Sequence, residues 1–172
     1  LKPNVQTSNK KFEVNIESEI EYGLGAIKGV ADAFIDHLCS KREKTHFKDL
    51  WDFSKKIDIR LGGKKSLEAL SQSGAFDSLA PTRSVAIECT KDMLNDGRQL
   101  NGNSNLKSGD LFSEMEESFD PYEKYKNINE LTLSEKLELE KKSLGYYLSG
   151  HPVLAIENKI KKIRSNTINK LN

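Results

Sequence analysis

The chain has 172 residues, a formal net charge of +1, 36% apolar residues and 31% charged residues, enough to bury a core in one domain or two small modules. No apolar run approaches the ~18 residues of a membrane span and no signal peptide opens the chain, which excludes membrane and secretory proteins. The two cysteines, Cys39 and Cys89, form neither a disulfide framework nor a four-ligand zinc site, so we expect a reducing, cytoplasmic environment.

The charge is segregated along the chain. Residues 41–65 carry nine Lys or Arg against four acids, residues 110–140 carry ten acids against three lysines, and residues 141–172 carry seven bases against one acid. Such blocks are typical of a polyanion-binding face with a separate acidic connector, and equally of ordinary solvated helix faces. Because the chain begins with Leu1 in place of Met, we expect a piece of a longer protein.

Local patterns predict a mostly α-helical fold that follows a short N-terminal strand segment. Apolar residues alternate loosely over residues 12–22, which indicates strand. Helical periodicity follows over residues 29–42 and 47–56, and a third helix is expected to end at Gly74, in the position favoured for a left-handed cap. A fourth helix is expected from about Pro81 to residue 95, since proline suits a first helical turn.

The periodicity stops between residues 97 and 131, where the turn-rich composition predicts a flexible loop. We expect order to resume at a capping box formed by Thr132 and Glu135, with a helix through Leu137 and Leu144 and then a stop signal at Gly150 and Pro152. A last helix with one basic side is expected after that signal.

Two segments share one supersecondary pattern, a glycine turn between two helices. The first is residues 22–30, Tyr-Gly-Leu-Gly-Ala-Ile-Lys-Gly-Val, and the second is residues 70–79, Leu-Ser-Gln-Ser-Gly-Ala-Phe-Asp-Ser-Leu. Glycine lets the backbone approach a partner closely, and the N-terminus of the next helix offers free N–H groups to an anion. A helix-hairpin-helix holds a nucleic-acid phosphate in this way without reading sequence.

The candidate DNA-binding residues are the turn residues and the basic side chains beside them. They are Gly25, Lys28, Gly29 and Val30 at the first turn, and Lys64, Lys65, Gly74, Ala75 and Arg83 around the second. The alternative is an ordinary turn closed by a glycine. For a single such turn this alternative is the better interpretation. For two turns beside basic residues, DNA binding and the ordinary turn are about equally supported. Such hairpins usually carry a second glycine, where this chain has Ala31.

The sequence offers no self-contained catalytic site. The three histidines, His37, His46 and His151, lack a cysteine at metal-ligand spacing, and no Walker loop, nucleophile elbow or Asp-x-Asp pair is present. These observations indicate a binding module that uses no cofactor of its own.

Four collinear motifs resemble the bacterial replicative DNA polymerase III alpha subunit family. They are the run over residues 22–30, Phe47-Lys-Asp-Leu-Trp-Asp-Phe53, Leu67-Glu-Ala-Leu-Ser-Gln-Ser-Gly-Ala-Phe-Asp-Ser-Leu79 and Leu144-Gly-Tyr-Tyr-Leu-Ser-Gly-His-Pro152. They occur in the order and spacing of the family, and the likeness covers nearly the whole chain.

The resemblance implies a place within a larger enzyme. Residues 1–21 would end the fingers region, 22–96 would form a tandem helix-hairpin-helix DNA-binding module, 97–131 a flexible linker, and 132–172 a helical connector toward an oligonucleotide-binding (OB) domain. The parent would be a DNA-directed DNA polymerase, a nucleotidyltransferase that uses Mg²⁺ and meets other replicase subunits. Its catalytic aspartates would lie outside this chain, which would hold double-stranded DNA by its backbone during chromosomal replication without activity of its own.

The resemblance further implies binding to the sliding clamp, the beta subunit. The family carries a Gln-x-x-(Leu/Met)-Phe-like motif after the hairpins, matched here by Ser108, Gly109, Asp110, Leu111 and Phe112. Two adjacent apolar side chains on a polar tether can fill a pocket of a partner, and the alternative is that they dock on their own domain. Ser108 replaces the glutamine and removes a contact worth about 1 kcal/mol, roughly fivefold in affinity, so we expect weakened binding.

Two other classes of function stay open. A stand-alone helix-hairpin-helix repair enzyme, a glycosylase or nuclease, would need a catalytic Lys or Asp after a Gly-Pro-Gly-like hairpin, which this sequence lacks. A structural scaffold would show no DNA affinity.

Overall fold

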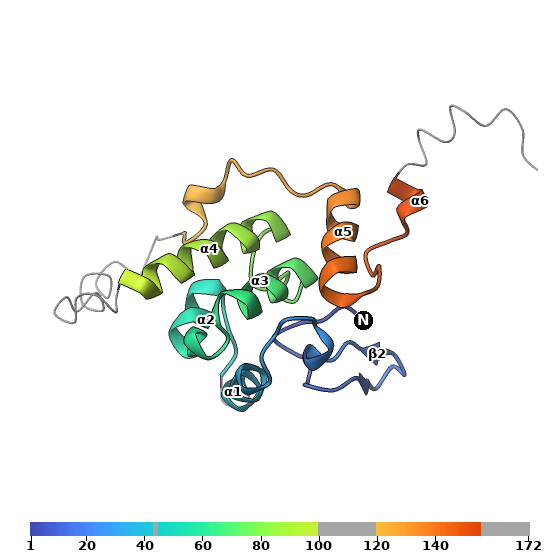
Figure 1. Ribbon diagram of the computed structural model, residues 1–172, viewed down its shortest axis with the longest axis horizontal. Helices are drawn as coiled ribbons and strands as arrows, with labels where there is room; N and C mark the ends of the chain where they lie inside the picture. The colour runs from blue at the N-terminus through green and yellow to red at the C-terminus, as the bar shows by residue number, and fades with distance from the viewer. Residues whose placement is uncertain (43–44, 100–119, 156–172) are drawn as a thin grey trace, which may run out of the picture.

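The computed structural model describes residues 1–42, 45–99 and 120–155 and confirms the mostly helical prediction (Figure 1). The elements in chain order are β1 (Glu13–Val14), β2 (Ile20–Glu21), the 3₁₀-helix η1 (Leu24–Ala26), α1 (Asp32–Arg42), α2 (Leu50–Lys56), η2 (Ile59–Leu61), α3 (Gly63–Ser73), α4 (Arg83–Gln99), η3 (Glu123–Tyr125), α5 (Leu133–Leu144) and α6 (Pro152–Ala155). No helix in the described ranges combines the length and apolarity that crossing a bilayer requires.

The N-terminal strand segment is a small antiparallel hairpin. Glu13 lies opposite Glu21 and Val14 lies opposite Ile20, so each strand has only two paired residues. The alternation over residues 12–22 therefore predicted strand correctly. The apolar side chains Val14 and Ile20 are largely exposed, which leaves the hairpin outside the core.

Helix α3 packs against both α4 and α5 (Figure 1). Its residues Leu67 and Leu70 are buried, and Phe76 in the turn after α3 packs edge-to-face on Phe53 of α2 at 5.1 Å between ring centroids. This burial of apolar surface fixes α3 relative to α2, α4 and α5. Both glycine turns adjoin this core.

The predicted helix caps are present at two sites. Gly74 adopts a φ of +83°, its N–H donates to the carbonyl of Ser71, and the N–H of Ala75 donates to the carbonyl of Leu70. These bonds form a Schellman motif, which uses carbonyls left unpaired at the end of α3. At the start of α5, Thr132 and Glu135 form the expected capping box.

The stop signal predicted at Gly150 and Pro152 is wrong for α5. The helix ends at Leu144 because Gly145 takes a φ of +84° and its N–H bonds to the carbonyl of Lys141. Pro152 instead begins α6, where a first-turn proline loses no helical hydrogen bond. The remainder of the expected last helix lies outside the described residues.

The described ends of the expected flexible linker differ from that expectation. Helix α4 continues to Gln99, and residues 120–131 pack on the helical core. The hydroxyl of Tyr122 accepts the N–H of Leu50 at 3.0 Å and donates to the carbonyl of Leu79. Hydrophobic periodicity does not predict the packing of this segment, because it contacts the core through single tyrosines and not through a repeating pattern of apolar residues.

Candidate nucleic-acid interface

The first glycine turn, between η1 and α1, is held by neighbouring segments on two sides. The N–H of Gly25 donates to the carbonyl of Lys10 at 2.9 Å, and the N–H of Lys28 donates to the carbonyl of Ser143 in α5 at 2.8 Å. Gly29 follows with a φ of +96°, a conformation that favours glycine. The turn is thereby fixed in position, although Gly25 and Lys28 offer no free amide to a ligand.

The first turn of α3 lies directly beside this glycine turn. The hydroxyl of Ser66 accepts the N–H of Ala31 at 3.0 Å and donates to the carbonyl of Gly29 at 3.4 Å. A Cβ placed on Gly29 would lie 3.1 Å from Cε of Lys65, so the Lys65 side chain covers this glycine. The fold therefore brings Lys65, from a distant part of the sequence, against the first turn.

Three exposed lysines surround the turn: Lys28, Lys64 and Lys65, hereafter the basic face. The side chain of Lys28 lies over Gly145, where a Cβ would be 3.4 Å from Nζ. Nζ of Lys64 lies 3.6 Å from Oε1 of Glu68. Because this ion pair is exposed to solvent, it offsets little of the positive charge of Lys64. Three of the predicted basic residues are thus presented to solvent around the first turn.

Open backbone amides accompany the basic face. Within the described ranges, no hydrogen bond reaches the N–H groups of Gly29, Asp32 or Ala33 at the start of α1, or those of Gly63 and Lys64 at the start of α3. Such N–H groups, at the positive end of the helix dipole, suit an anion. The N–H of Val30, also a predicted contact, instead donates to the carbonyl of Ile27 at 3.3 Å.

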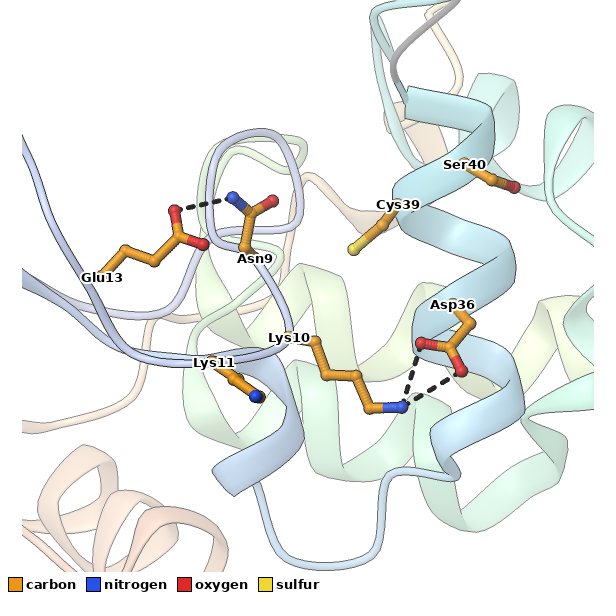
Figure 2. A pocket seen from close by; sticks show the side chains of 7 residues that line it. All are labelled: Asn9, Lys10, Lys11, Glu13, Asp36, Cys39 and Ser40. Atoms are coloured by element: carbon orange, nitrogen blue, oxygen red, sulfur yellow. Dashed lines mark hydrogen bonds and ion pairs between the residues drawn. The ribbon is translucent and has the colours of Figure 1, made fainter.

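Lys10 offsets part of the acidic charge near the start of α1, and Figure 2 shows its ion pair with Asp36. Its Nζ lies 3.0 Å from Oδ1 of Asp36 and 3.7 Å from Oδ2 of Asp32, and the hydrogen bond with Asp36 raises the pKa of Lys10. The pair lies in an open hollow of about 440 Å³ between residues 9–13 and α1. The charges that line this hollow, Lys10, Lys11, Glu13 and Asp36, balance, which gives it no preference for an anion.

The second glycine turn, between α3 and α4, is built around a buried ion-pair cluster. The Arg83 side chain is 1% exposed, its Nη2 lies 2.6 Å from Oδ2 of Asp77 and its Nη1 lies 3.0 Å from Oε1 of Glu140. A Cβ on Gly74 would lie 2.2 Å from Nη2, so only glycine leaves room for the guanidinium. Burial opposes the charged form, but the two carboxylates hold the pKa of Arg83 above its ordinary value.

This cluster corrects three predicted DNA contacts. Arg83 lies inside the molecule, because glycine at position 74 admits its side chain. Gly74 and Ala75 are buried as well, and their N–H groups serve the cap of α3. Of the three basic residues expected around the second turn, Arg83 is therefore buried within the fold, whereas Lys64 and Lys65 are exposed and Lys65 lies against the first turn.

Glu140 completes the cluster and was missed from the sequence. One carboxylate oxygen accepts the N–H groups of Leu148 and Ser149 at 2.8 Å each, and the other accepts the Ser149 hydroxyl. Burial alone would raise the pKa of Glu140, but these bonds and Arg83 lower it. One signal was present in the sequence: Glu140 shares the buried side of its helix with Leu137 and Leu144.

A second missed residue, Glu130, caps the N-terminus of α4. Its Oε2 accepts the N–H of Arg83 at 3.1 Å, and its Oε1 accepts the N–H of Ser84 at 3.3 Å and the Ser84 hydroxyl at 3.1 Å. We call this arrangement the Glu130 cap. Lys136 lies 3.2 Å from the same carboxylate.

The Glu130 cap favours an ionised carboxylate. Partial burial raises the pKa of Glu130, but hydrogen bonds from backbone N–H groups and from Lys136 outweigh it and lower the pKa to about 2. Because the folded-state pKa is depressed, its contribution to stability is present above the ordinary value of 4.5 and is lost as the pH falls toward 2. At neutral pH the Glu130 carboxylate at the N-terminus of α4 therefore stays ionised and paired with Lys136.

The candidate clamp-binding residues Ser108, Gly109, Asp110, Leu111 and Phe112 lie outside the described residues. The described ranges contain no group of three or more His, Cys, Asp or Glu side chains that could hold a metal ion.

Two glycine turns between helices, the first flanked by lysines and open amides, define the helix-hairpin-helix class. A family model described as "Helix-hairpin-helix motif" matches residues 1–86, and the chain belongs to this family. Over most of its length it is also similar to a segment of proteins named "DNA polymerase III subunit alpha", which confirms the resemblance found in the sequence.

The similar proteins are much longer than this chain. Identity is 35% with the protein of Pseudomonas fluorescens, over 96% of this chain and 16% of the relative, and 37% with that of Pasteurella multocida, over 88% and 13%. It is 32% with that of Pseudomonas aeruginosa, over 96% and 16%. The chain thus spans less than a fifth of the length of these relatives.

The buried cluster predicts a large loss of stability on Glu140→Gln. This change leaves the guanidinium of Arg83 with one carboxylate, and breaking a buried ion pair from one side costs about 3 kcal/mol or more. Urea unfolding measures the loss. Glu138→Gln removes the same charge from an exposed position of α5 and should change the unfolding free energy by less than about 0.5 kcal/mol. Equal effects of the two changes would contradict the structural role of Glu140.

Proposed function

We propose that this chain binds duplex DNA through the first glycine turn and the basic face, as one segment of a replicative DNA polymerase. The observation that carries the proposal is the gathering of Lys28, Gly29 and Lys65 beside open backbone amides. Membership of the helix-hairpin-helix family and the names of the relatives support the same function.

The contact would be with the phosphate backbone. The free N–H groups of Gly29 and of the first turns of α1 and α3 would donate to phosphate oxygens, and the lysines of the basic face would supply charge. None of these groups reads a base edge, so binding would be independent of sequence. Neutralising phosphates releases counterions, and affinity would therefore fall steeply with salt.

The rest of the replicase is also part of the proposal. In the longer protein, DNA would be polymerised with Mg²⁺ at carboxylates outside this chain. The segment described here would need no metal ion or other cofactor and would act by holding the duplex product, while the parent protein meets the other replicase subunits. A stand-alone repair enzyme is disfavoured, since the family motifs run through nearly the whole chain without a catalytic hairpin residue.

Binding to the sliding clamp is the second half of the proposal. It rests on the sequence Ser108-Gly-Asp-Leu-Phe112, which resembles the family's clamp motif and overlaps the start of the acidic block of residues 110–140. Leu111 and Phe112 would fill an apolar pocket of the clamp, and the surrounding polar residues would serve as the tether.

DNA binding is tested by a titration of duplex DNA at several salt concentrations. The Lys65→Gln variant should bind more weakly, and the slope of log affinity against log salt should become shallower by about 0.9, the loss of one phosphate contact. Lys91→Gln removes the same charge from an exposed position of α4 and is the matched control. Affinity that depends strongly on sequence, or equal losses in both variants, would overturn the assignment of the basic face.

Clamp binding is tested by calorimetry with the sliding clamp of the same source. The chain should bind, a variant with Leu111→Ala and Phe112→Ala should not, and Ser108→Gln should strengthen binding roughly fivefold by restoring one polar contact. Absence of binding by both the unmodified 172-residue chain and the Ser108→Gln variant would refute this part of the proposal.

A further inference from the structure

Tyr146 and Tyr147, hereafter the aromatic pair, are exposed in the turn that follows α5. Their side chains are 66% and 41% exposed. The other tyrosines of the chain, Tyr22, Tyr122 and Tyr125, pack in or against the core, and the hydroxyl of each is hydrogen-bonded within the fold. The fold therefore leaves two consecutive aromatic residues in contact with solvent.

The turn that carries the aromatic pair is held at both ends. Gly145 adopts a φ of +84°, and its N–H donates to the carbonyl of Lys141 at 3.1 Å. On the other side of the pair, Glu140 accepts the N–H groups of Leu148 and Ser149 at 2.8 Å each. Because the backbone between these points is already ordered, a ligand that covers the rings would cost the chain little conformational entropy.

Two lysines from distant parts of the sequence lie beside the aromatic pair. Nζ of Lys141 lies 5.2 Å from the ring centroid of Tyr147 and donates to the carbonyl of Gly145 at 3.1 Å. A Cβ on Gly145 would lie 3.4 Å from Nζ of Lys28, which belongs to the basic face. The ammonium groups of Lys28 and Lys141 therefore both approach Gly145, and the aromatic pair adjoins the basic face.

We propose that the aromatic pair is a stacking site for unpaired nucleobases, and that Lys28 and Lys141 bind the phosphates next to those bases. Aromatic rings that stack on bases and lysines that pair with phosphates are the two components of surfaces that hold single-stranded nucleic acid. Every base has a π-face, so stacking would not depend on sequence. The inference rests on the proposed function only in joining this site to a duplex on the basic face.

The lysines favour a nucleic acid over a protein as the occupant of this surface. Aromatic residues are enriched in protein–protein interfaces, but lysine is depleted there. The charge of the sequence favours the same occupant, since residues 141–172 carry seven bases against one acid. Two ammonium groups beside exposed rings therefore suit a polyanion that also presents aromatic bases.

Unpaired bases are the part of DNA that the rings can reach. In a duplex each base is covered by its neighbours in the stack, and exposing its face costs unstacking energy. A single-stranded overhang presents its base faces without that cost. The basic face would hold the backbone of the duplex while the aromatic pair holds the strand that continues beyond it, so a duplex with an overhang should bind more tightly than a blunt duplex.

The inference is tested by fluorescence anisotropy on the 172-residue chain with a blunt duplex and with the same duplex extended by thymidines on one strand or the other. The unmodified chain should bind one of the extended duplexes about tenfold more tightly, the gain from stacking on about one base. A variant with Tyr146→Leu and Tyr147→Leu keeps apolar side chains without rings; it should lose most of this preference and keep its affinity for the blunt duplex.

The variant with Tyr146→Phe and Tyr147→Phe is the matched control, because it keeps both rings and should keep the preference for the overhang. Equal affinity of the unmodified chain for blunt and extended duplexes would overturn the inference. A preference that is unchanged in the leucine variant would also overturn it, and is the result expected if the aromatic pair serves a protein partner.

Single-stranded oligothymidine separates this inference from the proposed function. It should bind the unmodified chain and the phenylalanine variant saturably, and the leucine variant about tenfold more weakly. Absence of binding by the unmodified chain would refute the stacking site, whether or not the blunt duplex binds. Oligothymidine binding that depends on the rings, together with no binding of the blunt duplex by any variant, would instead refute the proposed function alone.

Discussion

The position of both glycine turns depends on the buried guanidinium of Arg83. It binds Asp77, in the turn after α3, and Glu140, on α5, so it joins two elements that are far apart in the sequence. Glu140 in turn holds the backbone of Leu148 and Ser149. A single ionic cluster therefore fixes α5 against the second glycine turn.

The cluster also positions the first turn, because α5 is hydrogen-bonded to that turn. The carbonyl of Ser143 accepts the N–H of Lys28, and the carbonyl of Leu144 accepts the hydroxyl of Tyr22 at 3.0 Å. Both bonds come from the C-terminal end of α5, which Glu140 and Arg83 hold in place. The turn proposed to bind DNA is thus positioned by residues more than a hundred positions later in the chain. Gly74 is a condition for this arrangement, since any side chain there would displace the guanidinium.

Local signals in the sequence predicted much of the fold. The left-handed cap at Gly74 and the capping box at Thr132 depend on residues within one or two turns, and both are present. The expected helix through Leu144 is present, but its stop signal was assigned to Gly150 because Gly145 and Gly150 carry the same local signal, and only the structure shows which one adopts positive φ. The packing of residues 120–131 depends on Tyr122 and Tyr125, which no periodicity identifies.

The candidate site was harder to predict because it depends on pairs distant in sequence. Lys65 was expected to add charge beside the second turn, whereas its side chain lies against Gly29 of the first turn, a contact between segments distant in sequence. Arg83 looked like a DNA-binding residue for the same reason, a positive charge beside a glycine turn, and became buried because its partners Asp77 and Glu140 converge on it. Charge and turn pattern alone do not distinguish these two outcomes, since burial is decided by the partner across the fold.

The proposed DNA contact lies at the first turn, whereas the N-terminus of α4 after the second turn is capped by the carboxylate of Glu130. The most direct test is a residue-resolved map of backbone amide shifts when the unmodified chain is titrated with a short duplex at low salt. If the first turn holds the phosphate backbone, the amide resonances of Gly29, Ala33 and Lys64 should shift saturably, and those of Arg83 and Ser84 should not move at sub-saturating DNA. Shifts that begin at Arg83 and Ser84 and spare Gly29 would contradict it.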